Sequence, residues 1–223
     1  ALTRGRTITR EAILGFIDFE RGNLRESRRS LTAALERDPN DADSHFYLGI
    51  TLVAAGQLEE ARLLSLRLSA SDPLSPIAGM LAGVASCFVG RAAEGLPQME
   101  QALTMDPESI IHHWTLGYLY AFAGRFADAA AQAEWLDARA PQLPYTVQLR
   151  ALVAAVAGRT AEALEWVRQV DTAALDGHHK FHLAEVFGLA GDVPRALSLF
   201  EEAVDTSFYP HQFFAVYCPF LGP

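Results

Sequence analysis

Three closely spaced histidines are the side chains of this sequence best suited to chemistry. His178 and His182 are four residues apart, on one face of an expected helix that also carries His179, and Glu185 follows within reach. Two histidines at this spacing can bind zinc, but a catalytic zinc site also needs a third ligand and a general base. The sequence HHKFHLAE lacks the glutamate that directly follows the first histidine in zinc protease helices. Partly exposed histidines at a helix start are therefore favoured, and His178 and His182 remain the candidate metal ligands.

No other motif indicates catalysis or a cofactor. The two cysteines, Cys87 and Cys218, lie far apart, and neither has a partner at a metal-binding spacing. The sequence contains no nucleophile elbow, phosphate-binding glycine loop or paired-carboxylate motif. We therefore expect a protein that is not an enzyme and that carries no cofactor.

A regular recurrence of glycine indicates how these side chains are positioned. The interval is 34 residues four times and 33 residues once, at Gly22, Gly56, Gly90, Gly124, Gly158 and Gly191. A period in this range marks one small unit copied along the chain, and each copy buries its apolar side only against its neighbours. The glycine supplies a left-handed cap that closes the first helix of each unit. The sequence thus predicts a stacked solenoid.

Four further columns accompany the glycines. A small residue stands seven positions before each glycine and another stands five positions after it, which lets helix axes approach closely. Leucine commonly precedes the first small residue, and proline follows the glycine by 17 residues in the first four units, after Asp38, Asp72, Asp106 and Ala140. Together these columns resemble the tetratricopeptide repeat over about residues 8 to 210, the alternative being another helical repeat of similar period.

The resemblance implies an all-α fold, a right-handed superhelical solenoid of about six helix-turn-helix repeats followed by an aromatic C-terminal segment. The first helices are expected over residues 8–21, 42–55, 76–89, 110–123, 144–157 and 177–190, with each second helix starting about three residues after its glycine. The repeats are expected at about 8–41, 42–75, 76–109, 110–143, 144–176 and 177–210, which makes 1–210 the solenoid and 211–223 a capping or docking segment.

Two units depart from the pattern. Pro97 lies several residues inside the second helix of the third unit, where it should delay the helix start or kink the helix. The glycines of that unit, Gly79, Gly83 and Gly95, make it the expected bend. The fifth unit has Arg150 in the leucine column and no proline at its end, which weakens the prediction of its helix pairing.

In the family that the chain resembles, the first helices line a concave groove that receives a peptide or a helix. The corresponding positions lie ten, six and three residues before each turn glycine. The candidate groove residues among them are Phe16, Phe19, Phe46, Ile50, Met80, Val84, Trp114, Tyr118, Leu152 and Phe181. The alternative is that the superhelix winds tightly enough for these side chains to pack against one another as core.

The composition of these positions predicts an apolar partner segment. Co-chaperone repeats of the family grip a C-terminal carboxylate with lysine, asparagine and arginine, and none of the three occurs at the corresponding positions. A carboxylate clamp is therefore not expected, and the partner is expected to supply apolar anchors.

Charge and hydropathy exclude two classes of partner. The net charge is −9, and outside the arginine-rich first 37 residues acidic side chains dominate, so nucleic acid is not an expected partner. No run approaches the roughly 18 to 20 apolar residues that span a bilayer, and no signal peptide opens the chain. We expect a soluble, cytoplasmic protein that does not bind membranes.

The preference for arginine over lysine suggests a GC-rich bacterial genome.

The last residues, FYPHQFFAVYCPFLGP, are unusually aromatic for the end of a repeat array, whose outer face is normally polar. They must pack on the last repeat, enter the groove or dock on another molecule. They resemble the closing segment of arrays appended to bacterial serine/threonine kinases and adenylate cyclases, without the basic residues and the Asp-Pro that usually follow. The difference favours a truncated array and leaves open a catalytic domain before Ala1.

The sequence therefore predicts a non-catalytic scaffold that binds a protein segment in an apolar concave groove. The alternative is a regulatory or self-associating module of a multidomain bacterial signalling protein.

Overall fold

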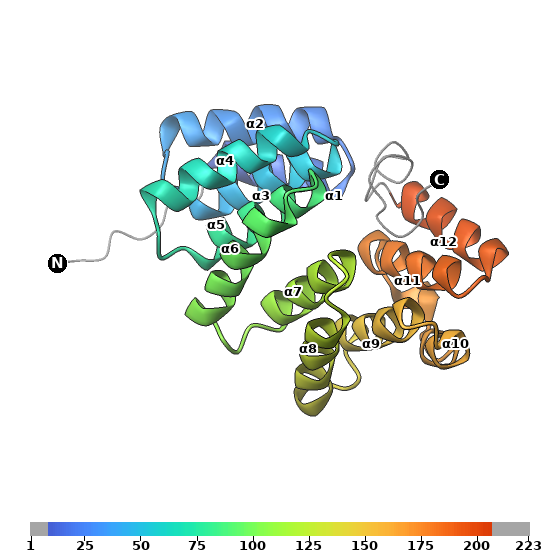
Figure 1. Ribbon diagram of the computed structural model, residues 1–223. Helices are drawn as coiled ribbons and strands as arrows, with labels where there is room; N and C mark the ends of the chain where they lie inside the picture. Colours follow the sequence, from blue (N-terminus) through green and yellow to red (C-terminus); the bar gives the residue numbers. More distant parts are fainter. Residues whose placement is uncertain (1–8, 207–223) are drawn as a thin grey trace.

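The computed structural model describes residues 9–206, and within this range the chain consists of helices and their connections, without strands (Figure 1). The helices are α1 (Arg10–Glu20), α2 (Leu24–Arg37), α3 (Ala42–Ala54), α4 (Leu58–Ser71), α5 (Pro76–Phe88), α6 (Ala92–Met105), α7 (Ile110–Phe122), α8 (Phe126–Arg139), α9 (Pro144–Val156), α10 (Thr160–Arg168), α11 (Gly177–Leu189) and α12 (Val193–Asp205), with a 3-10 turn, η1 (Thr172–Ala174), before α11.

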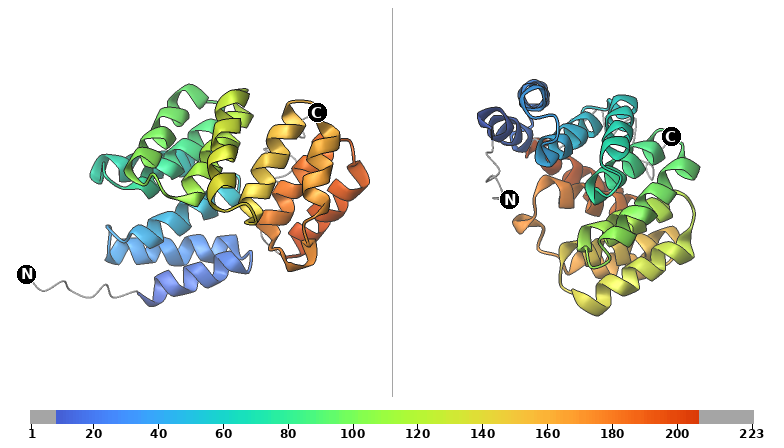
Figure 2. Two further views of the ribbon diagram at one scale, coloured as in Figure 1. Left: turned by 90° about the horizontal axis from the view of Figure 1, so that it is seen from below. Right: turned by 90° about the vertical axis from the view of Figure 1, so that its left-hand side faces the viewer.

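The helices pack as consecutive antiparallel pairs that follow one another along a curved path (Figures 1 and 2). This arrangement confirms the predicted all-α repeat solenoid. The aromatic segment expected at 211–223, including Cys218, lies outside the described residues. Among the helices that are described, none is both long enough and apolar enough to cross a bilayer.

Each helix pair turns at one of the repeated glycines. All six have φ between 72° and 86°, a left-handed conformation that glycine adopts without the steric penalty of a Cβ atom. The second helix starts two residues after the glycine, one earlier than predicted. Five of the six first helices begin at the predicted residue, whereas α1 begins at Arg10 instead of residue 8.

Polar residues fix most starts of the first helices. The side chains of Thr9, Asp41, Ser75, Ser109 and Asp176 accept a hydrogen bond from the backbone N–H three residues later. Each of these contacts satisfies one of the amides that an α-helix leaves without a partner at its N-terminus. These caps and the Asp-Pro or Ala-Pro steps after the second helices set the limits of the first four repeats.

The fifth repeat differs because its second helix is short. Helix α10 ends at Arg168, and η1 replaces the last turns that the other second helices have. Arg150 of α9 nevertheless contacts α10, because its guanidinium lies 3.6 Å from the centre of the Trp166 ring. The same guanidinium forms an ion pair with Asp137 of α8. Arginine in the leucine column thus packs by stacking on an aromatic ring.

Pro97 does not delay its helix, because α6 begins at Ala92 and continues through the proline. The proline removes an amide that would bond the carbonyl of Ala93, but both residues lie on the exposed face, where water can hydrate that carbonyl. On the opposite face, α5 and α6 meet at Gly83 and Gly95. A Cβ added to Gly95 would lie 2.6 Å from the Gly83 carbonyl oxygen and 2.8 Å from Cys87 Sγ.

This close approach predicts that Gly95→Ala destabilises the protein. The added methyl must push α5 and α6 apart, and overpacking of this kind costs about 1 to 3 kcal/mol. Urea denaturation followed by circular dichroism measures the change. Ala93→Ser, on the exposed face of the same helix, is the control and should change stability by less than about 0.5 kcal/mol. Equal stability of Gly95→Ala and the wild type would contradict the close contact.

Candidate functional site

The ten candidate groove residues divide into a partly exposed set and a buried set. Phe16, Phe46, Ile50 and Val84 keep solvent-accessible surface, and Phe16 is the most open, at 36%. The other six, Phe19, Met80, Trp114, Tyr118, Leu152 and Phe181, are buried. Each of these six is at most 8% exposed, so as packed they offer a partner little surface.

The exposed set lies on the first three repeats. The Phe16 ring packs against Tyr47, with ring centroids 4.7 Å apart, and Phe46 contacts the same tyrosine at 5.3 Å. Tyr47 was not among the predicted groove residues, although it directly follows the Phe46 column and joins the rings of α1 and α3. We call Phe16, Phe46, Tyr47, Ile50 and Val84 the open apolar face.

Phe181 of the buried set is covered by helices of earlier repeats. Phe181 of α11, 2% exposed, belongs to the same hydrophobic cluster as Leu48 and Leu52 of α3 and Ala85 of α5. The first helix of the last repeat therefore shares a core with the second and third repeats.

Around Trp114 the packing is aromatic and polar together. The Trp114 and Tyr118 rings stack with centroids 5.8 Å apart, and the His182 ring contacts both edge-on, at 4.8 and 4.9 Å. Glu185, with no exposed surface, accepts hydrogen bonds from the Tyr118 hydroxyl at 2.9 Å and from His182 Nδ1 at 2.8 Å. The sequence placed Glu185 within reach of the histidines, and the structure shows that its contact is with His182.

The two candidate metal ligands lie in direct contact. His178 Nε2 and His182 Nε2 are 3.2 Å apart. His182 uses Nδ1 to donate to Glu185, so its Nε2 carries the lone pair and accepts from His178. This chain of hydrogen bonds runs from α7 through Glu185 into the first turn of α11.

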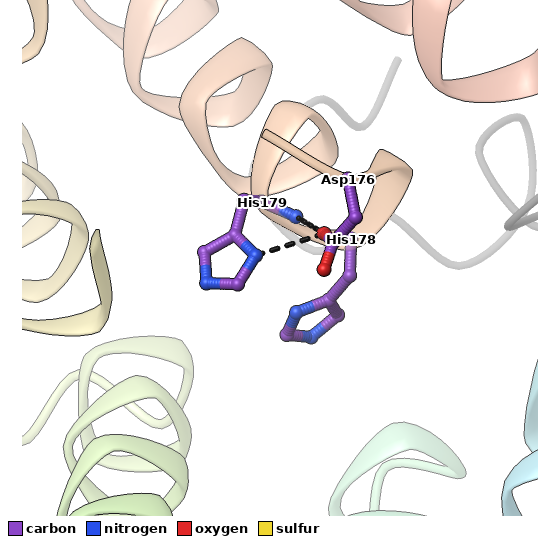
Figure 3. A group of neighbouring side chains, drawn as sticks. All are labelled: Asp176, His178 and His179. Carbon is purple, nitrogen blue, oxygen red and sulfur yellow. Dashed lines mark hydrogen bonds and ion pairs between the residues drawn. The ribbon is translucent and has the colours of Figure 1, made fainter. Parts of the chain in front are cut away.

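Asp176 and His179 complete the start of α11. The Asp176 carboxylate accepts from the His179 backbone N–H at 2.9 Å and from His179 Nδ1 at 2.8 Å, as Figure 3 shows. Donor atoms of Asp176, His178 and His179 all lie within 4.8 Å of one another. In Figure 3 a ring nitrogen of His179 is directed at the Asp176 carboxylate, and the His178 side chain lies next to them.

Burial controls the charge of these groups. Desolvation holds the pKa of His178 well below its usual value, helped by the neighbouring histidines, and lowers the pKa of His182 to about 3. The hydrogen bonds from His179 lower the pKa of Asp176 to about 2. At neutral pH, Asp176 is therefore a carboxylate beside uncharged His178 and His182 imidazoles.

The histidines at the corresponding place in the fourth repeat are structural. His113 is bonded through Nε2 to the Pro107 carbonyl at 3.0 Å, and its ring stacks on Trp135 at 3.4 Å. His112 is buried, with Nδ1 3.7 Å from an Asp106 carboxylate oxygen. Burial lowers the pKa of His112 despite the opposing effect of Asp106.

The depressed pKa of His112 predicts a loss of stability in acid. Below about pH 6.5 the unfolded chain binds a proton at this residue that the folded chain does not, so the free energy of unfolding falls as the pH falls. His112→Gln should remove this part of the dependence. Urea denaturation at about pH 7 and about pH 5 measures the two slopes; parallel losses of stability in the wild type and the variant would contradict the prediction.

The Tyr118 hydrogen bond predicts a second stability difference. Tyr118→Phe deprives a fully buried carboxylate of a donor and should cost about 1 to 3 kcal/mol. Tyr120→Phe is the matched control, since Tyr120 donates to Glu100 at 2.8 Å, and Glu100 is partly exposed and keeps its contact with Arg125 at 2.9 Å. Denaturant titrations should show the larger loss for Tyr118→Phe, and a reversed order would show that Glu185 does not depend on the hydroxyl.

Known proteins share both sequence pattern and fold with this chain. The family model described as tetratricopeptide repeat matches residues 17–76 and 88–144, and a second model of the same description matches residues 149–169. No curated protein sequence matches significantly.

Three solved structures illustrate the fold. A tetratricopeptide repeat protein from Parabacteroides merdae is 15% identical with a TM-score of 0.57, over 95% of this chain and 84% of that one. The type IV pilus biogenesis factor PilW is 18% identical with a TM-score of 0.63, over 92% and 96%. One chain of the APC/C Cut9-Hcn1 hetero-tetramer is 14% identical with a TM-score of 0.65, over 91% of this chain and 40% of that chain. With its glycine turns, helix pairs and matched repeats, the chain belongs to the tetratricopeptide repeat family.

Proposed function

We propose that the protein is a non-catalytic scaffold that binds a peptide or helix of a protein partner on the open apolar face. The observation that carries this proposal is the exposure of Phe16, Phe46, Ile50 and Val84. The residues at the same positions of the other repeats are buried. The tetratricopeptide repeat fold supports a role in protein-protein interaction, and repeats of this family are generally not enzymes.

The chemistry of this face suits an apolar segment. The aromatic rings of Phe16, Phe46 and Tyr47 are in contact, which gives a partner a continuous surface to cover. Covering about 100 Å² of apolar surface contributes roughly 2.5 kcal/mol. Association itself costs about 4 to 15 kcal/mol, so a partner must engage several of these side chains at once. An amphipathic helix with apolar residues on one face meets this requirement.

The six buried residues are not proposed as anchors for the partner. Trp114, Tyr118 and Phe181 are already packed, and a partner could reach them only if the array opened. Of the structures that share the fold, the Cut9-Hcn1 hetero-tetramer contains a second kind of chain, which is the kind of assembly that a scaffold forms.

Selection of random displayed peptides on the purified protein tests the proposal. We expect the selected peptides to carry apolar residues and to bind Phe16→Glu and Ile50→Glu at least about tenfold more weakly than the wild type, since about 1.4 kcal/mol corresponds to tenfold. Fluorescence anisotropy of a labelled selected peptide measures the affinity.

Leu63→Glu is the matched control, because Leu63 is similarly exposed, at 44%, but lies on α4, a second helix. Binding should survive this substitution. Peptides whose affinity depends on Leu63 and not on Phe16 or Ile50 would refute the open apolar face as the binding surface. Light scattering of the free protein tests the alternative, in which the module self-associates.

A further inference from the structure

The start of α11 has the geometry of a metal site. His178 Nε2 and His182 Nε2 are 3.2 Å apart. Zinc binds imidazole nitrogen at about 2.0 to 2.1 Å, and in a tetrahedral site two such nitrogens lie about 3.3 to 3.4 Å apart. The two imidazoles therefore stand at nearly the separation that one zinc ion requires.

The residues behind His182 have the arrangement that metal-binding histidines use. A ligating histidine commonly donates its other ring N–H to a carboxylate, which fixes the ring and the tautomer. Here His182 Nδ1 donates to the fully buried Glu185, and the Tyr118 hydroxyl holds the other oxygen of that carboxylate. The lone pair on His182 Nε2 is thus directed at His178 by residues of two helices, α7 and α11.

One oxygen donor lies near each of the two histidines. Asp176 has a carboxylate oxygen within 4.8 Å of a His178 nitrogen (Figure 3), and its negative charge offsets the partial positive charge of the helix N-terminus. Gln148 of α9 is 2% exposed and lines the same small cavity as His182. Its Nε2 donates to the His179 carbonyl at 3.0 Å, and no residue that the structure describes donates a hydrogen bond to its Oε1.

We propose that His178 and His182 bind one zinc ion through their Nε2 atoms, with the Asp176 carboxylate on the side of His178 and the Gln148 carbonyl in the cavity beside His182 as the oxygen donors. The proton that His178 shares with His182 moves to His178 Nδ1 when the ion binds, so the imidazole stays neutral. The ion has a structural role: it holds the first turn of α11 against α9 and, through Glu185 and Tyr118, against α7.

Zinc titration of the full chain, freed of metal with a chelator, tests the proposal. Isothermal calorimetry should show one ion per chain. His178→Gln and His182→Gln should each weaken binding at least about 100-fold, and Glu185→Gln should weaken it about 10- to 100-fold, as loss of a supporting carboxylate does. His113→Gln, at the corresponding place in the fourth repeat, is the control and should leave the affinity unchanged.

A second measurement does not depend on whether the variants fold. Cobalt(II) added to the wild-type protein should give the visible absorption of a tetrahedral site, and X-ray absorption of the zinc form should show two imidazole ligands. Absence of zinc binding by the wild type at micromolar concentration would overturn the proposal. So would fewer than two imidazole ligands, or binding that survives in both His178→Gln and His182→Gln. None of these outcomes bears on peptide binding to the open apolar face.

Discussion

The close approach of neighbouring helices at small residues is the constraint on which the rest of this structure depends. A single helix pair cannot bury its apolar side, so stability comes from stacking, and stacking requires columns without bulky side chains. A Cβ on Gly49 would lie 2.8 Å from Leu81, and one on Gly117 would lie 2.5 Å from Leu149. Each leucine belongs to the first helix of the following repeat. The spacing between repeats is therefore fixed by leucine packed directly onto glycine backbone.

This spacing and the curvature of the array give the inner face two different halves. In the first three repeats the inner-face columns keep Phe16, Phe46, Ile50 and Val84 partly exposed, although Phe19 and Met80 in the same repeats are buried. In the last three repeats the same columns meet one another and form core. Polar groups buried there must be satisfied within the protein, because an unsatisfied buried carboxylate is costly. The contacts of Glu185 with Tyr118 and His182 meet that requirement and link the fourth repeat to the sixth.

The two proposed sites use these two halves in different ways. The open apolar face offers surface to another chain, and its recognition depends on hydrophobic burial and shape. The histidine pair at α11 is oriented by residues of the closed half, which hold its geometry before any ion binds.

The sequence alone determined the repeat length, the helix pairs and the turn glycines, because these depend on local rules: left-handed backbone needs glycine, and proline ends a helix. It also identified His178, His182 and Glu185, since helical spacing places them on one side. It did not determine which inner-face residues are buried, the continuation of α6 through Pro97, or the early end of α10. The tertiary structure decided that Trp114, Tyr118 and Phe181 pack inside while Phe16 stays open. Curvature accumulates over all six repeats, so contacts between α11 and α3 join residues more than a hundred positions apart, and no local pattern encodes them.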